Sequence, residues 1–327
     1  MIWQPGNDRL QLPRLEADVG IGVEEERLEY HHLCLAWNWK YDASFVALLA
    51  QACREGSVNL LQVTPDNLAE VLAGLERGEI GFGHYWDRAT DADPAFLPLA
   101  GWAERIQARL VNPNAKASLT WDKAAMHLAL LWTGLQTPHT LIIPSALESP
   151  ELPEPDLSPL GGPFIIKPAH GGGGDGVVME AATLAEVCAA RLAYPDDKYL
   201  LQAHISPVAL DRRDAWFRVI YCLGDVLPCW WDTVSHLYLP VTPEEETRHG
   251  LAPLREITAR IAEISGLDLF STEIALSGSH QFVIVDYVND PLDLRLQSET
   301  ADGVPDDIIA RIVRQIVYHV GPMPAGC

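Results

Sequence analysis

The stretch from Pro163 to Glu180 constrains the fold most, because it combines a strand pattern with a run of glycines. Phe164 to Ile166 is a short apolar run typical of a buried strand, and Lys167 follows at its end. The four glycines from Gly171 have no Cβ and adopt positive φ freely, and an apolar run resumes after Gly176. The pattern predicts a flap whose backbone N–H groups cover an anion such as phosphate. A flexible hairpin with a solvated lysine explains this stretch equally well.

Composition narrows the classes of protein and partner. The 327 residues, 48% of them hydrophobic, suffice for two or three packed domains. The formal net charge of −22 argues against nucleic acid or an anionic membrane as a partner. No apolar run is long enough to span a bilayer. The six cysteines form no Cys-x-x-Cys pair and no signal peptide is recognised, so we expect a reducing cytoplasm without zinc or thioredoxin-type chemistry.

Strand and helix patterns alternate in the first third of the chain. Apolar runs at 33–36, 58–63 and 80–82 are separated by amphipathic patterns that end at Gly56 and Gly78, and Asp42 is the expected cap of the first helix. Such alternation predicts a Rossmann-like parallel α/β domain over residues 1–113. The expected strand-end loops, 37–41 and 84–88, are rich in aromatic residues. They indicate either a ligand site beyond the strands or partly buried surface aromatics.

The rest of the chain divides into two predicted subdomains. Residues 114–206 contain a helix from near Ser118 to Gly134, a proline-rich loop, the glycine flap and a strand at 199–203. Residues 207–327 contain two antiparallel hairpins, at 214–231 and 272–288, and two amphipathic helices. The fold class is therefore α/β followed by α+β.

The last hairpin carries candidate metal ligands. Glu273 lies on one strand, and Asp286 and Asn289 lie on the other. Carboxylate and amide oxygens suit Mg²⁺, which keeps water and substrate phosphates as its other ligands. Exposed strand carboxylates are the alternative. The run Val283 to Val285 favours the metal site, because a carboxylate at the end of a buried strand needs a partner.

In order, these pieces resemble the ATP-grasp superfamily, in the style of carboxylate–amine ligases such as ribosomal-protein glutamate ligase, glutathione synthetase and D-alanine–D-alanine ligase. Each motif is weak alone, and the six together in this order are a strong signal. The matching residues are Trp121-Asp-Lys123, Ile165-Ile-Lys-Pro168 with Gly171 to Gly176, Leu200-Leu-Gln-Ala-His-Ile205, Trp216-Phe-Arg218-Val with the Gly224 turn, Thr272-Glu-Ile274, and Val285-Asp-Tyr-Val-Asn-Asp-Pro291. The likeness implies an N-terminal domain followed by a two-subdomain ATP-grasp fold.

The resemblance implies ATP and Mg²⁺ as cofactors, with Mn²⁺ as an alternative metal. It assigns the phosphates to Lys123, Lys167 and a lid made of Gly171, Gly172, Gly173 and Gly174. It assigns adenine to the hinge Gln202, Ala203, His204 and Ile205, the ribose to Asp211, and the metal to Glu273, Asp286 and Asn289. Arg218 matches an arginine directed toward the phosphoryl-transfer centre.

Two departures from the family pattern stand out. The family usually spaces its last acid and Asn as E-x-N, whereas this chain has Asp286-x-x-Asn289. Either a bulge or a shifted strand register would accommodate the extra residue. Some ligases also carry an Arg before the first metal acid, where this chain has Phe270-Ser271-Thr272. Arg295, or Arg212 and Arg213, are the candidates to supply that charge.

The implied reaction joins a carboxylate to an amine through an acyl phosphate, with small molecules or peptides as the two substrates. A small-molecule kinase on the same scaffold and a nucleotide-binding module without turnover are the alternatives. The metal trio argues against the module, because nucleotide binding alone needs less charge. Neither substrate can be named from these residues, and a homo-oligomer stays open.

Overall fold

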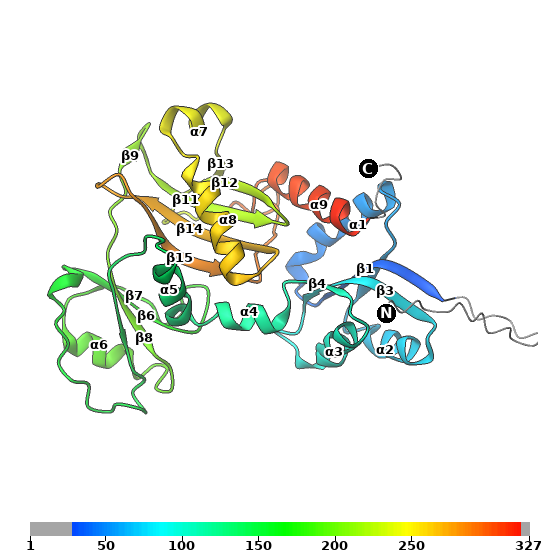
Figure 1. Cartoon of the computed structure of the whole chain (residues 1–327), viewed down its shortest axis with the longest axis horizontal. Coiled ribbons are helices and arrows are strands. Elements are labelled where there is room, and N and C mark those ends of the chain that lie inside the picture. The colour runs from blue at the N-terminus through cyan, green and yellow to red at the C-terminus, as the bar shows by residue number, and fades with distance from the viewer. Residues whose placement is uncertain (1–27, 322–327) are drawn as a thin grey trace, which may run out of the picture.

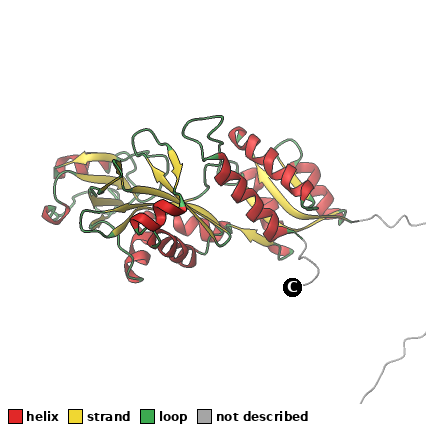
Figure 2. Ribbon diagram, turned by 90° about the horizontal axis from the view of Figure 1, so that it is seen from above, coloured by secondary structure: helices red, strands yellow, loops and turns green. Residues whose placement is uncertain are grey.

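The computed structural model describes residues 28–321. The charge run Glu24 to Glu26 and Cys327 lie outside the described residues, as do the first 27 residues assigned to the N-terminal domain. Figures 1 and 2 show the N-terminal sheet at one end of the long axis of the molecule. Among the described residues, no helix combines the length and apolar character needed to cross a membrane.

The N-terminal domain contains the predicted parallel α/β sheet. Its four strands lie in the order β2-β1-β3-β4, and every neighbouring pair is parallel. The elements are β1 (Glu29–Trp37), α1 (Ala43–Glu55), β2 (Leu60–Val63), α2 (Leu68–Arg77), β3 (Ile80–Arg88), α3 (Leu97–Arg105) and β4 (Arg109–Val111). One expected loop is wrong, because residues 84–88 continue β3 and pair with β1 and β4.

Asp42 has a different role from the helix cap that was expected. It precedes α1, but its carboxylate makes no capping hydrogen bond. Instead both oxygens accept from Arg88 at 2.8 Å, and Arg88 also donates to the Leu292 carbonyl at 3.1 Å. Both side chains of the pair are buried. A guanidinium buried at the end of β3 without a carboxylate would be strongly destabilising. The ion pair with Arg88 therefore contributes more than a capping hydrogen bond would.

The expected helix from Ser118 to Gly134 is two helices, α4 (Asn114–Thr120) and α5 (Lys123–Trp132). The break lies at Asp122, whose side chain accepts from the backbone N–H groups of Ala124 and Ala125. A new N-cap thus begins α5 and places Lys123 in its first turn.

The middle of the chain forms an antiparallel sheet in the order β5-β8-β6-β7, which we call the lid sheet. Its elements are β5 (Thr140–Ile143), β6 (Phe164–Pro168), β7 (Val178–Ala181), α6 (Leu184–Ala190) and β8 (Tyr199–Ala203). Every residue of β6 is buried, as expected for a central strand. The glycine flap, residues 169–177, connects β6 to β7.

The C-terminal part is built on an antiparallel sheet in the order β13-β12-β11-β14-β15, which we call the core sheet. Its strands are β11 (Trp216–Cys222), β12 (Asp225–Trp231), β13 (Tyr238–Pro240), β14 (Leu269–Leu276) and β15 (Phe282–Asn289). The helices α7 (Pro243–His249) and α8 (Pro253–Ser265) and a small hairpin of β9 (Ala209–Leu210) and β10 (Arg213–Asp214) complete it. Figure 1 shows α8 lying across this sheet.

The last helix, α9 (Asp306–Val320), packs against the N-terminal part of the chain. It packs on α1 (Figure 1), and residues of both helices share one hydrophobic core with the core sheet, among them Leu49, Ile220 and Ile312. The approach is close at Gly56, where a Cβ would lie 2.7 Å from Cγ1 of Val317. Burying side chains of this size contributes about 1.5–3 kcal/mol each, so this contact holds the N-terminal domain against the core sheet.

Candidate nucleotide and metal site

Lys167 points from the lid sheet to the core sheet. Its Nζ donates to the Val285 carbonyl at 3.1 Å and lies 5.6 Å from the ring centre of Tyr287. Burial lowers the pKa of Lys167, whereas the neighbouring Asp286 carboxylate acts to raise it. The strand that ends in this lysine therefore presents its ammonium to the strand that carries the acids.

Glu273 and Asp286 are direct partners across β14 and β15. Glu273 accepts a hydrogen bond from Nε1 of Trp216 at 3.0 Å, and its Oε1 lies 3.6 Å from Nη1 of Arg218. Burial raises the pKa of Glu273, with Arg218 opposing it and Asp286 adding to it. Two carboxylates side by side with limited solvation form a site that favours a cation.

A β-bulge explains the unusual spacing of Asp286 and Asn289. Asp286 pairs with Glu273, and Asn289 pairs with Ser271, so two steps along β14 correspond to three along β15. Because Ser271 and Glu273 are two residues apart, they share a face of the sheet, and the bulge brings their partners to that same face. The pairing of β14 with β15 shifts register at this point, which accommodates the extra residue.

Arg218 lies beside the acids in an aromatic setting. Its guanidinium carbon is 4.9 Å from the ring centre of Trp231 and 5.8 Å from that of Tyr238, and its Nε donates to Oγ of Ser271 at 3.2 Å. Burial acts to lower the pKa of Arg218, but Tyr238 and three nearby carboxylates, those of Glu273, Asp286 and Asp293, together raise it above its ordinary value. The arginine therefore stays charged next to Glu273.

The glycine flap contacts Lys123 through two hydrogen bonds. The Lys123 backbone N–H donates to the Ala169 carbonyl at 2.9 Å, and its Nζ donates to the Gly171 carbonyl. Four flap glycines have positive φ: Gly171, Gly173, Gly174 and Gly176. A backbone of this shape strongly disfavours side chains, which is the physical reason for glycine at these positions.

A buried hydrogen-bond chain lies behind the hinge. Gln202 Nε2 donates to Oγ1 of Thr140 at 3.1 Å and to the Tyr287 hydroxyl at 2.8 Å, and Nδ1 of His127 lies 2.7 Å from that hydroxyl. Burial lowers the pKa of His127 to about 4, with Lys167 adding to the shift, so the ring is neutral. Sequence reasoning missed His127 and Tyr287, although His127 lies one turn after Lys123 and Tyr287 follows Asp286.

The remaining hinge residues offer backbone groups. Ala203 N–H donates to the His139 carbonyl at 2.8 Å. Within residues 28–321, the backbone N–H groups of His204 and Ile205 have no hydrogen-bond acceptor. These two groups are therefore available to a ligand at the end of β8.

The chain is similar to several solved structures. A RimK-domain ATP-grasp protein from Sphaerobacter thermophilus is 19% identical, with a TM-score of 0.59 over 87% of this chain and 98% of that one. D-alanine–D-alanine ligase from Bacillus anthracis, complexed with ATP, is 10% identical, with a TM-score of 0.60 over 88% and 96%. The chain has the ATP-grasp fold.

A third similar structure is the macrocyclase MdnC from Microcystis aeruginosa bound with its precursor peptide MdnA. It is 10% identical, with a TM-score of 0.60 over 88% of this chain and 99% of that one. No protein-family model and no curated protein matches the chain. Identities this low establish the ATP-grasp fold alone.

Within the ATP-grasp fold, two predicted site residues are engaged elsewhere. Arg295 pairs with Asp293 at 2.7 Å and with Asp302 at 2.9 Å, so two carboxylates of its own loop neutralise its charge. Asp211 is on the turn between β9 and β10, half exposed, and bonds to Arg248 and to His249 at the end of α7. The parts of Arg295 and Asp211 in nucleotide chemistry stay predictions.

The donor set at the core sheet fits a hard divalent cation. In the described part of the chain, no cluster of three or more His, Cys, Asp or Glu side chains forms a complete metal site. Glu273 and Asp286 supply two carboxylates, and Asn289 lies on the same face. Mg²⁺ suits such a partial set, because water and substrate phosphates complete its octahedron.

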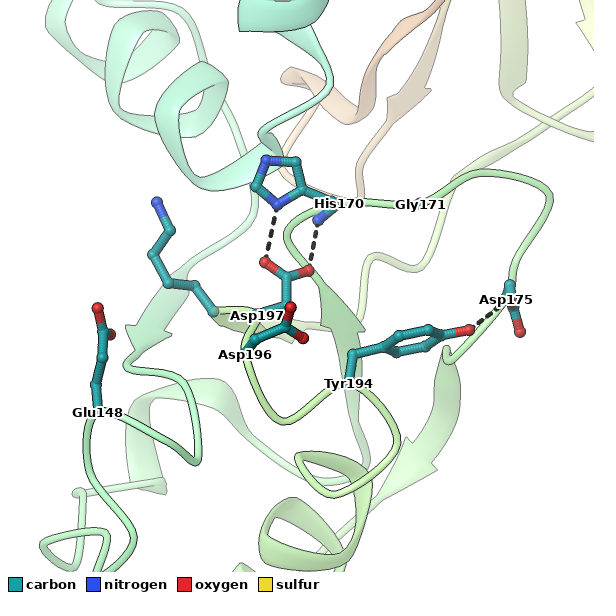
Figure 3. Close-up of a pocket in the computed structure, with 8 residues that line it drawn as sticks. Glu148, His170, Gly171, Asp175, Tyr194, Asp196 and Asp197 are labelled. Carbon is teal, nitrogen blue, oxygen red and sulfur yellow. Dashed lines mark hydrogen bonds and ion pairs between the residues drawn. The ribbon is translucent and has the colours of Figure 1, made fainter. Parts of the chain in front are cut away.

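A cavity of about 490 Å³ adjoins the flap of the ATP-grasp fold (Figure 3). Its lining comes from the flap, from the loop that precedes β8 and from the loop that follows β5, and comprises Glu148, His170, Gly171, Asp175, Tyr194, Asp196, Asp197 and Lys198. Gly171 of the predicted phosphate lid lines the cavity, which therefore lies beside the flap and contains none of the predicted metal ligands.

Proposed function

We propose that the chain is an ATP-dependent ligase that joins a carboxylate to an amine through an acyl phosphate. The observation that carries this proposal is the meeting of two sheets. Lys167 of β6 donates to the carbonyl of Val285, the residue before Asp286, and Asp286 faces Glu273. An ammonium and a pair of carboxylates so close together suit a metal-bound polyphosphate. The ammonium offsets negative charge on the phosphates, and the carboxylates bind the metal ion.

The proposal assigns a role to each group. Lys123, Lys167 and the glycine flap bind the phosphates, and residues 202–205 bind adenine through backbone groups. Glu273, Asp286 and Asn289 hold Mg²⁺, or Mn²⁺ in its place, and that ion would neutralise charge on the phosphates. Arg218, kept charged beside Glu273, faces the phosphoryl-transfer centre.

The reaction proceeds in two steps. A carboxylate oxygen of the substrate bonds to the γ-phosphorus while the bond from that phosphorus to the β,γ-bridging oxygen breaks, releasing ADP. The amine nitrogen then bonds to the acyl carbon, and the amine loses a proton. The bond between that carbon and the phosphate oxygen breaks, and phosphate leaves with the electron pair. Arg218 stabilises negative charge in the first step, and the closed flap keeps water from the acyl phosphate.

Neighbours of the same fold support the substrate class that we propose. PsnB was solved as an ATP-grasp ligase with a minimal precursor, Mg and ADP, and DcsG as a D-cycloserine synthetase. We accordingly propose a small molecule or a peptide as the substrate here. The net charge of −22 disfavours nucleic acid and anionic membranes, and we propose a cytoplasmic enzyme.

A coupled assay tests the proposal. The purified chain with Mg²⁺ and ATP is offered amino acids, short peptides and small carboxylates, and ADP and phosphate are both measured. Release of both that depends on the amine supports the ligase. ADP with a phosphorylated product and no free phosphate indicates a kinase instead. Binding of ATP without ADP from any substrate pair indicates a nucleotide-binding module and contradicts the proposal.

A further inference from the structure

The tip of the glycine flap makes few contacts of its own. Two backbone bonds close its turns, from Asp175 N–H to the Gly172 carbonyl and from Val177 N–H to the Gly174 carbonyl, each 3.2 Å long. A Cβ built on any of residues 171–174 would meet no atom within 4 Å. The shape of the flap therefore depends on what holds its two stems.

One carboxylate holds the first stem. Asp197 accepts from the backbone N–H of His170 and from its Nδ1, both at 2.8 Å (Figure 3). The next residue, Lys198, accepts at its carbonyl from the Ala169 N–H at 2.8 Å. Three hydrogen bonds thus fix the backbone where the chain leaves β6 and enters the flap.

One tyrosine holds the second stem. The Tyr194 hydroxyl donates to the Asp175 carboxylate (Figure 3). Its ring packs against Gly176, where a Cβ would lie only 2.7 Å from Cε2 of Tyr194 and where φ is +71°. The backbone of Tyr194 is held in turn, because its N–H donates to the hydroxyl of buried Tyr199 at 3.2 Å.

The same loop also reaches α5. Lys198 Nζ lies 2.8 Å from the carboxylate of Asp122, which caps α5 immediately before Lys123. Residues 194–198, which we call the anchor loop, therefore contact both stems of the flap and the helix start that carries the predicted phosphate lysine. The anchor loop thus links the flap to the start of α5, where Lys123 also donates directly to the Ala169 and Gly171 carbonyls.

We propose that Asp197 and Tyr194 of the anchor loop are positioning residues that hold the glycine flap ready to cover the nucleotide phosphates. The inference rests on the proposed function, because it takes the flap and Lys123 to bind phosphate. The two residues act through the flap and do not touch the nucleotide. A flap fixed at both stems loses less conformational entropy when it closes on ATP, so nucleotide binding is tighter.

The test uses the full chain and two variants with matched controls. Asp197→Asn removes the charge and one of the two acceptors, and Tyr194→Phe removes the hydroxyl but keeps the ring on Gly176. Asp196→Asn removes the same charge one residue away, from a carboxylate that makes no hydrogen bond within the described residues. Tyr318→Phe, on the exposed face of α9, controls for the lost hydroxyl.

Two measurements are made on each protein. Hydrogen exchange of residues 169–177 is followed without nucleotide, and the Kd values of Mg-AMPPNP and of adenosine are measured by calorimetry. We expect faster exchange of the flap in both variants and Mg-AMPPNP binding about tenfold weaker, the usual effect of losing one hydrogen bond to a charged group. Adenosine affinity and both controls stay as in the wild type, because the hinge is unchanged.

The inference is overturned if hydrogen exchange of residues 169–177 is unchanged in both variants. It is also overturned if the Asp196→Asn protein behaves like Asp197→Asn. An equal loss of adenosine affinity also overturns it, because that would be a general defect of folding. If the wild-type chain binds neither Mg-AMPPNP nor adenosine, the proposed function is contradicted instead. In that case the exchange comparison alone still decides whether the anchor loop holds the flap.

Discussion

Lys167 and Asp286 lie 119 positions apart in the chain, and the Lys167 ammonium donates to the carbonyl of the residue immediately before Asp286. The lid sheet thus reaches the core sheet at the strand that carries the acids. Burial lowers the pKa of the lysine, and the two carboxylates of Asp286 and Glu273 counteract that effect. An ammonium and two carboxylates lie close together here with limited solvation. Such an arrangement favours a ligand that consists of an anion with a bound cation.

We expect Lys167→Ala to weaken Mg-AMPPNP binding by about tenfold to hundredfold, the loss expected for a charge-assisted hydrogen bond to phosphate. Lys167→Met keeps most of the side-chain volume without the charge and should give the same result. Lys40→Ala, on the surface of the N-terminal domain, serves as the control. Calorimetry measures the affinities, and an affinity equal to that of the wild type would exclude a phosphate role for Lys167.

Asp286→Asn should abolish Mg²⁺-dependent ADP formation, because it removes a charged metal ligand while keeping the size of the side chain. Adenosine binding should persist, since the hinge lies at the end of β8 and not at the core sheet. Asp214→Asn removes an exposed carboxylate from β10 and should leave turnover unchanged. ADP is measured over a Mg²⁺ titration, and normal turnover of the Asp286 variant at low Mg²⁺ contradicts the metal site.

Arg88→Met should lower the free energy of unfolding by about 3–5 kcal/mol, because it leaves the buried Asp42 carboxylate without its partner. The double variant with Asp42→Leu should recover part of that loss, since no unpaired charge remains. Urea denaturation of both proteins measures the difference. A double variant no more stable than Arg88→Met would show that the contact of Arg88 with the Leu292 carbonyl matters more than the ion pair.

His127 should make stability depend on pH between about 4 and 6.5. Its folded pKa is lowered to about 4 from an ordinary 6.5, so the unfolded chain binds more protons in this window. The free energy of unfolding therefore falls as the pH drops from 6.5 toward 4, by up to about 3 kcal/mol, and is unaffected by this group above 6.5. His127→Gln keeps an acceptor for Tyr287 but does not titrate.

Denaturation of the wild type and of His127→Gln at several pH values isolates this contribution, because the other titrating groups are common to both. The difference between the two proteins should change across the window and become constant above pH 6.5. A difference that stays constant from pH 4.5 to pH 7.5 would show that His127 does not carry the effect.

Local patterns in the sequence predicted the elements that depend on neighbouring residues. The run Phe164 to Ile166 became a buried strand, and the glycines after it became a flap with positive φ. The alternation of strands and helices predicted a parallel sheet, because buried faces repeat with the period of each element. The same logic failed at Asp122, where a helix cap interrupts an otherwise continuous apolar pattern.

Contacts between distant residues could not be predicted in this way. Asp42 looks like a cap in the sequence, yet in the fold it neutralises Arg88. The pairing of Arg295 with Asp293 and Asp302 in its own loop was likewise not predicted. Which charges meet depends on how the loops close, and the spacing of charged residues along the chain carries no record of that closure.

The sequence by itself determined the kinds of group available, namely a lysine at a strand end, a glycine flap and an acid on each strand of a late hairpin. Only the tertiary structure decided that these groups meet. The bulge in β15 brings Asn289 to the face of Asp286, and sheet packing places Lys167 against that strand. The reason is physical, because side-chain periodicity reports burial within one element, whereas register and packing between sheets depend on all the elements together.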